Sequence, residues 1–245
     1  MNWNWGIQEI PEEGLIIRSN NTPLFKIKRD HEEILIAAGD MGDDEQFNRF
    51  IVGKDAKIKL EPALPELPIV IKPEFPLSVL PGLSFRCFVA VPLVFSIWSS
   101  RGKKMHMLKE ISVLNLSRSW FGDPWVGEVA YFLDSPLHAS IESYSESDRS
   151  VFCPVNIVNR SSQILTLDRM LLRVPYLSVY QGEKRLYSNG TRISFRGQDQ
   201  ISQVSFYKGP PDLEKNLTQI ASPRETDEAG LLSKSFYFFK TIYNG

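Results

Sequence analysis

The stretch from Val151 to Arg196 decides the fold, and it reads VFCPVNIVNRSSQILTLDRMLLRVPYLSVYQGEKRLYSNGTRISFR. Short apolar runs alternate in it with turn signals at 159–162 (Asn-Arg-Ser-Ser), 181–183 (Gln-Gly-Glu) and 189–190 (Asn-Gly). Such close, regular spacing is typical of an antiparallel β-sandwich. The stretch therefore predicts an architecture, and it contains no pattern that predicts a chemical activity.

Two local features of this stretch predict strand register. The apolar phase set by Leu165 and Leu167 is reversed at 170–174, and one extra residue in a strand has that effect, so we expect a β-bulge at Asp168-Arg169. Asn-Gly is a strong two-residue turn signal, so we expect Asn189-Gly190 to close a hairpin.

The rest of the chain also reads as strands. Phe25 and Ile27 alternate with Lys26 and Lys28, which is the period of a half-buried strand. The stretch 61–81 is rich in proline but keeps an apolar alternation, which favours a crossing between sheets over an interdomain linker. Further strands are expected at 15–18, 33–38, 129–133 and 236–243, with a long hairpin joining 85–98 to 105–116.

Two short segments have helical spacing. Phe47, Phe50 and Ile51 form one stripe within 43–52, where Asp43 can cap a helix. The second segment, 212–221, repeats apolar residues at i, i+4, i+7 and i+8 and follows a proline.

These elements together predict an all-β, mainly antiparallel fold that is β-sandwich-like, with two packed β modules and two short helices. We expect an N-terminal module at 1–118 and a C-terminal β-sandwich module at 119–245, and a single intertwined domain is the alternative. A chain of 245 residues with 42% hydrophobic residues is long enough to bury such cores.

Charge and hydropathy argue against several classes of function. Lys and Arg total 28 against 29 Asp and Glu, so no field of one sign favours nucleic acid. The longest apolar run, 89–98, has half the length that a membrane-spanning helix needs, and it contains Pro92, so no membrane span is expected. The N-terminus has no apolar signal core, and we expect a cytoplasmic location.

Cys87 and Cys153 are the two cysteines, and both lie on the apolar phase of expected strands. Two buried free thiols are the favoured interpretation, and a disulfide joining two sheets is the alternative.

Several segments follow one another in a distinctive order. They are FKIKR (25–29), Leu80-Pro81-Gly82, FRCFVAVPLVFSIW (85–98), a loop with Gly122 and Gly127, Tyr131, and PVNIVNRSS (154–162). This order resembles domain-of-unknown-function family 432. The resemblance covers about residues 15 to 208 and implies a β fold without an established activity, so it assigns no residue a role.

No catalytic or cofactor-binding motif is present. The chain has no phosphate-binding glycine loop, no dinucleotide fingerprint and no nucleophile elbow, so neither a catalytic residue nor a cofactor is predicted. His31, His106 and His138 lie far apart and share no metal-ligand spacing. The acidic cluster at 40–45 lacks the spacing of a calcium loop and is interpreted as a solvated turn.

The sharpest local feature is the aromatic loop, Arg118-Ser-Trp-Phe-Gly-Asp-Pro-Trp125. Such a loop more often closes one end of a core than binds a ligand, since large exposed apolar patches are uncommon. If it is exposed, Arg118, Trp120, Phe121, Asp123 and Trp125 form the candidate site for a partner or ligand.

Two functions follow from these observations. The favoured one is a non-catalytic β-sandwich protein that binds another protein, with a homo-oligomer allowed, a flat apolar patch and no pocket lined by ionisable groups. The alternative is a carbohydrate-binding or carbohydrate-processing protein, in which Trp120 and Trp125 stack on a sugar ring while Asp123 binds its hydroxyls.

Overall fold

The computed structural model describes residues 4–19, 21–39, 46–122, 124–125, 127–145, 149–197 and 202–226. The chain forms two compact units, each built from two separate segments. Unit 1 comprises Met1–Ala63 and Pro92–Leu114, and unit 2 comprises Leu64–Val91 and Asn115–Gly245. The continuous modules 1–118 and 119–245 stay a prediction.

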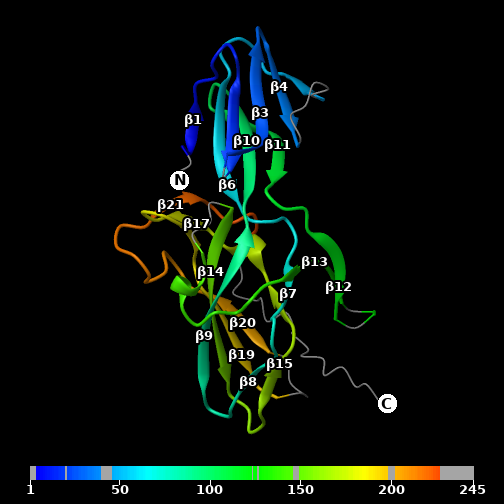
Figure 1. Cartoon of the computed structure of the whole chain (residues 1–245), viewed down its shortest axis with the longest axis vertical. Coiled ribbons are helices and arrows are strands. Elements are labelled where there is room, and N and C mark those ends of the chain that lie inside the picture. The colour runs from blue at the N-terminus through cyan, green and yellow to red at the C-terminus, as the bar shows by residue number, and fades with distance from the viewer. Residues whose placement is uncertain are drawn as a thin grey trace. The chain divides into compact units, whose positions relative to one another are not determined.

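Unit 1 holds two four-stranded antiparallel sheets, with the strand orders β1-β6-β10-β11 and β2-β3-β4-β5 (Figure 1). The strands are β1 (Gly6–Gln8), β2 (Leu15–Ser19), β3 (Thr22–Asp30), β4 (Glu33–Ala38), β5 (Asn48–Ile51), β6 (Lys57–Ala63), β10 (Val94–Arg101) and β11 (Lys104–Ser112).

The two sheets of unit 1 share one core. Phe25 and Ile27 are buried while Lys26 and Lys28 alternate with them, so the predicted period of two is confirmed. Across the core, the ring of Phe25 on β3 lies 5.1 Å from that of Phe95 on β10, edge to face. Such aromatic pairs add about 0.5–1.5 kcal/mol to the burial of their area.

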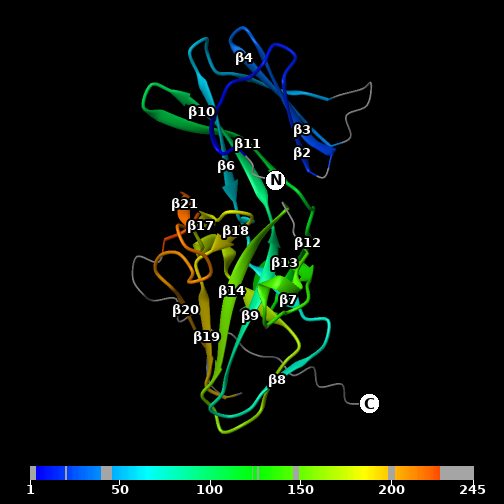
Figure 2. The ribbon, with the colours of Figure 1, turned by 60° about the vertical axis from the view of Figure 1, so that its left-hand side comes forward.

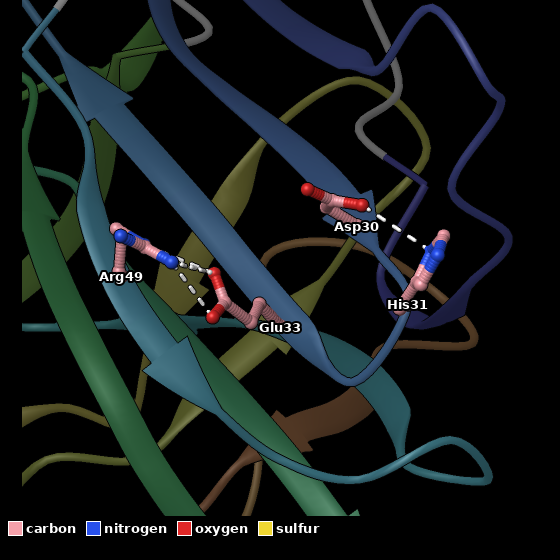
Figure 3. A network of polar contacts seen from close by, with 4 residues as sticks. All are labelled: Asp30, His31, Glu33 and Arg49. Carbon is pink, nitrogen blue, oxygen red and sulfur yellow. Dashed lines mark hydrogen bonds and ion pairs between the residues drawn. The ribbon is translucent and has the colours of Figure 1, made fainter.

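The helix predicted at 43–52 is wrong. Residues 48–51 form β5, which pairs with β4 through Ile34 and Phe50, and residues 43–45 lie outside the described part of the chain. A helix would have to bury its apolar stripe, but Ile51 is 81% exposed. Arg49 instead forms a bidentate ion pair with Glu33, diagonally across the strands (Figure 3).

Unit 2 contains the remaining strands in three sheets, whose orders are β12-β13-β7-β16, β15-β8 and β20-β19-β14-β18-β17-β21, with β9 also pairing with β14 (Figure 2). The strands are β7 (Ile69–Lys72), β8 (Leu77–Val79), β9 (Ser84–Pro92), β12 (Ser117–Phe121), β13 (Glu128–Asp134), β14 (Ser150–Asn159), β15 (Leu165–Leu167), β16 (Met170–Leu172), β17 (Val179–Gln181), β18 (Leu186–Ser188), β19 (Thr191–Phe195), β20 (Gln203–Phe206) and β21 (Thr218–Ala221). Two 3-10 turns, η1 (Ile141–Ser143) and η2 (Val174–Tyr176), are the helical elements of the described residues.

The hairpin predicted at Asn189-Gly190 is wrong. The strands on either side of it, β18 and β19, both pair in parallel with β14, and the register advances by one residue between them. A type I′ turn needs positive φ at both central residues, and Gly190 does not adopt it. Asn189 is buried, where its side chain accepts from Ser178 N and donates to Tyr207 O. The pair therefore interrupts one long parallel strand.

The reversal of apolar phase at Asp168-Arg169 has a different cause from the predicted bulge. The strand before it, β15, pairs with β8, whereas β16 pairs with β7 in another sheet. The chain changes sheets at this point: β15 buries Leu165 and Leu167, whereas all three residues of β16 are buried.

The helix predicted at 212–221 is also wrong. Its last residues form β21, which pairs with β17, and Asn216 adopts φ 63, a left-handed conformation that a helix does not continue through. Leu213 and Leu217 still pack against the cluster of Phe152, Tyr180 and Tyr187. The apolar spacing therefore indicated which residues pack inward, although the segment that carries them is irregular.

The expected run at 85–98 is two strands, because Leu93 separates β9 in unit 2 from β10 in unit 1. The hairpin itself is confirmed for β10 and β11, where Arg101 pairs with Lys104. The strand expected at 236–243 lies outside the described residues.

Candidate functional site

The predicted aromatic loop begins on β12, which pairs with β13 alone among the strands described. In this antiparallel pair Arg118 lies opposite Tyr131, and Trp120 lies opposite Val129. Because side chains two residues apart share a face of a sheet, these four lie on one surface. We call them, together with Glu66, which contacts Tyr131 and Arg118, and with Trp125 of the segment that joins β12 to β13, the aromatic face.

Both indoles of the aromatic face are exposed. Trp120 is 49% exposed and Trp125 is 92% exposed, and Val129 beside Trp120 is 44% exposed. The expectation that this loop closes the end of a core is therefore wrong. Burying apolar surface stabilises a fold by about 25 cal/mol per Å², and these exposed indoles do not contribute that stabilisation. Large exposed apolar side chains of this kind are the usual mark of a binding surface.

Polar groups share this face with Trp120. The Tyr131 hydroxyl donates to Glu66 Oε1 at 3.2 Å, and Arg118 Nη2 lies 3.8 Å from the same oxygen. Partial burial, reinforced by the neighbouring Glu66 carboxylate, raises the pKa of Tyr131 above its ordinary value. The hydroxyl therefore stays protonated at neutral pH and keeps its place beside Glu66.

A partly buried ion pair lies at the base of the loop. Arg173, just before η2, donates through Nη1 to Glu128 Oε2 at 2.9 Å and through Nη2 to Oε1. The backbone of Glu128 lies opposite Phe121, the last residue of β12. Bidentate pairs of this type fix geometry in two directions, so the ion pair locks the strand end from which the loop departs.

Two glycines approach each other where the loop closes. Gly122 has φ 106, and a Cβ built on it would lie 3.0 Å from the Cα of Gly127. Any side chain at Gly122 would be strained by both conformation and contact.

The structure brings together part of the predicted site. Arg118 and Trp120 share the aromatic face, Phe121 is half-buried, and Asp123 lies outside the described residues. Sequence reasoning missed Glu66, Val129 and Tyr131. Tyr131 and Val129 could have been found from their alternation on the next strand, but no local signal marks Glu66.

A second feature of unit 2 was not predicted at all. It is a cavity of about 370 Å³ whose lining includes Arg86, Asn156, Gly190, Tyr207, Lys208 and Asp212. The expectation of a surface without a pocket of ionisable groups is therefore not met. The lining holds no histidine, cysteine or serine and a single carboxylate, that of Asp212.

The cysteines are buried and free, as the favoured interpretation predicted, and the alternative of a disulfide is wrong. Burial raises the pKa of both Cys87 and Cys153 to about 12, so both are protonated at neutral pH and poorly nucleophilic.

Within the described residues, no three His, Cys, Asp or Glu side chains gather into a group that could hold a metal ion. The acidic residues at 40–45 lie outside them. No helix in the described part of the chain is long and apolar enough to cross a membrane.

Comparison with known proteins gives one match. The model of a family described as protein of unknown function (DUF432) matches residues 4–240, almost the whole chain. No curated protein and no solved structure matches.

Proposed function

This chain belongs to domain-of-unknown-function family 432, and we propose that it is a non-catalytic β-sandwich protein that binds another protein through the aromatic face. The observation that carries the proposal is the exposure of two tryptophans in one short segment, 92% for Trp125 and 49% for Trp120. Trp, Tyr and Arg are the residues most enriched at the energetic centres of protein interfaces, and the aromatic face presents all three.

The strand pairing and the ion pair that hold the aromatic face in place also favour binding without a large rearrangement. Trp120 lies on a paired strand, and the partly buried Arg173–Glu128 pair anchors the adjacent end of that strand pair. A side chain held in place before binding loses less conformational entropy on complex formation, which favours affinity.

The partner is a protein whose surface offers an apolar pocket for an indole and hydrogen-bonding groups for Arg118 and Glu66. Both of these charged side chains are more than half exposed and lie within 3.8 Å of each other. At the rim of an interface such groups contribute more to specificity than to affinity.

Site-specific photo-crosslinking tests this proposal. A benzophenone amino acid replaces Trp125 in the full chain, expressed in the native host, and in a matched control it replaces Phe75, which is 75% exposed elsewhere in unit 2. We expect a discrete cross-linked polypeptide from position 125 and none from position 75. A cross-link to a second copy of the chain would identify that copy as the partner and the protein as a homo-oligomer. The absence of any cross-link specific to position 125 contradicts the proposal.

A second candidate function has support from the same indoles. Sugar rings stack on exposed tryptophans, and the Glu66 carboxylate with the Arg118 guanidinium supplies groups for hydroxyls. Titration with a glycan panel, followed by tryptophan fluorescence, distinguishes the two. A saturable shift that Trp125→Ala removes favours carbohydrate, and an unchanged spectrum with every glycan rejects it.

A further inference from the structure

The cavity of unit 2 has the properties of a preformed small-molecule site. Its volume of about 370 Å³ lies in the range of sites that hold small ligands. It is made by the strands β9 and β14, by Gly190, and by the segment 207–212 that follows β20.

Tyr207 forms a fixed aromatic wall of this cavity. Its backbone N–H donates to Gly190 O at 2.8 Å, and its carbonyl accepts from Asn189 Nδ2 at 2.9 Å. Its hydroxyl accepts from Asn156 Nδ2 at 3.3 Å. A Cβ at position 190 would lie 2.6 Å from the Tyr207 ring, so the glycine is what allows the ring to lie there.

The segment after Tyr207 is held at its far end. Glu214 accepts hydrogen bonds from the Tyr187 hydroxyl and from Glu183 N. Between Tyr207 and Glu214, Pro210 and Pro211 line the cavity with rigid apolar surface. The wall therefore needs little ordering when a ligand enters.

The charge of the cavity favours an anion. Arg86 and Lys208 line it with a single acidic residue, Asp212. Within the described residues neither cation has an ion pair, and the guanidinium of Arg86 lies 5.4 Å from the centroid of the Phe88 ring. Carboxylates and phosphates are the groups that such cations bind best.

We infer that this cavity binds a small organic anion, in which a carboxylate or phosphate ester group contacts Arg86 and Lys208 while an apolar body lies against Tyr207 and the prolines. The inference rests on the cavity alone and does not depend on the aromatic face.

Ligand-observed NMR titration of the full chain tests the inference with four probes. Benzoate carries a carboxylate and phenyl phosphate carries a phosphate ester. Benzyl alcohol has the same aromatic ring but is neutral, and benzylamine has the ring but is cationic at neutral pH. We expect at least one of the anions to bind at least about tenfold more tightly than benzyl alcohol, and benzylamine to bind more weakly still. Equal binding of anionic and neutral probes, or no binding of either anion, overturns the inference.

Three variants locate the binding. Arg86→Gln combined with Lys208→Gln removes both cations, and we expect it to weaken the tighter anion at least about tenfold. Lys215→Gln removes one nearby exposed lysine outside the lining and should leave the affinity within about twofold. Gly190→Ala displaces the Tyr207 ring and should weaken every aromatic probe. Unchanged anion binding in the double variant overturns the assignment, and circular dichroism of each variant reports whether it is folded.

Discussion

Trp120 lies directly opposite Val129 in the antiparallel pair of β12 and β13, and both side chains are exposed on the same face of the sheet. A cross-strand apolar pair of this kind normally belongs to a core, where burial of each side chain stabilises the fold by about 1.5–3 kcal/mol. Its exposure together with Trp125 makes the aromatic face the surface from which we expect function.

Removing the Trp125 indole should not affect the fold. Because Trp125 is 92% exposed, Trp125→Ala should change the free energy of unfolding by no more than about 0.5 kcal/mol. Urea denaturation measures this, with Phe75→Ala as a control at another exposed position. A loss above about 2 kcal/mol would mean that the indole packs in the folded chain and that the aromatic face is structural.

Breaking the Arg173–Glu128 ion pair should destabilise unit 2. Glu128→Gln removes the carboxylate that accepts from both Nη atoms of the buried Arg173, and we expect a loss of about 2–3 kcal/mol, less than for a fully buried pair since Glu128 is partly exposed. The matched control is Glu33→Gln, which breaks the exposed bidentate pair with Arg49 in unit 1 and should cost less than about 1 kcal/mol (Figure 3). Equal losses in the two variants would contradict the anchoring role of Arg173.

A side chain at Gly122 should distort the loop. Gly122→Ala combines positive φ with a contact to Gly127, and we expect a loss of about 1–3 kcal/mol. Gly197→Ala is the control, since its φ is also positive but a Cβ there meets open space, so it reports strain alone. A loss at Gly122 no larger than that at Gly197 would show that the contact with Gly127 has no cost.

Alkaline pH should unfold unit 2 through its buried acids. Burial raises the pKa of Cys87 and Cys153 from 9.0 to about 12, and that of Tyr144 from 10.0 to about 12. Above pH 9 the thiols ionise in the unfolded chain but stay protonated in the folded one. The free energy of unfolding is therefore unaffected below pH 9 and falls as pH rises from 9 toward 12.

Denaturant unfolding at successive pH values measures this fall. Cys87→Ala with Cys153→Ala should lower the stability but flatten its pH dependence, because the two thiols no longer titrate while Tyr144 still does. A slope identical to that of the wild-type chain would contradict the assignment to the thiols.

Much of the architecture was predictable because strand periodicity is a local property. Phe25 and Ile27 alternate with lysines, as the pleat of a single strand requires. The structure buries Phe25 and Ile27 in agreement with this pattern. The apolar stripe at Leu213 and Leu217 likewise reported real burial. The stripe did not indicate the left-handed conformation of Asn216 between them, which ends any helix there.

Strand partners were not predictable because they depend on distant segments. Asn189-Gly190 has a favoured turn sequence, but β14, more than 30 residues earlier, pairs with both of its flanks and keeps them in one line. The position of the phase reversal at Asp168-Arg169 was evident in the sequence, while its cause, a change of sheet, depends on β7 and β8.

The candidate site shows the same division. The loop from Arg118 to Trp125 stands out by composition, but its exposure is a property of the folded unit. The cavity is lined by residues from four separate parts of the chain, including Arg86, Asn156 and Lys208, and no local pattern unites them.

The affinity of the purified cross-linked partner tests the central claim most directly. Isothermal titration compares the wild-type chain with the Trp120→Ala, Trp125→Ala double variant and with Phe75→Ala. Interface hot spots contribute about 2 kcal/mol or more, so we predict that the double variant raises Kd at least about thirtyfold while Phe75→Ala changes it less than about twofold. An unchanged Kd in a folded double variant would contradict binding through the aromatic face.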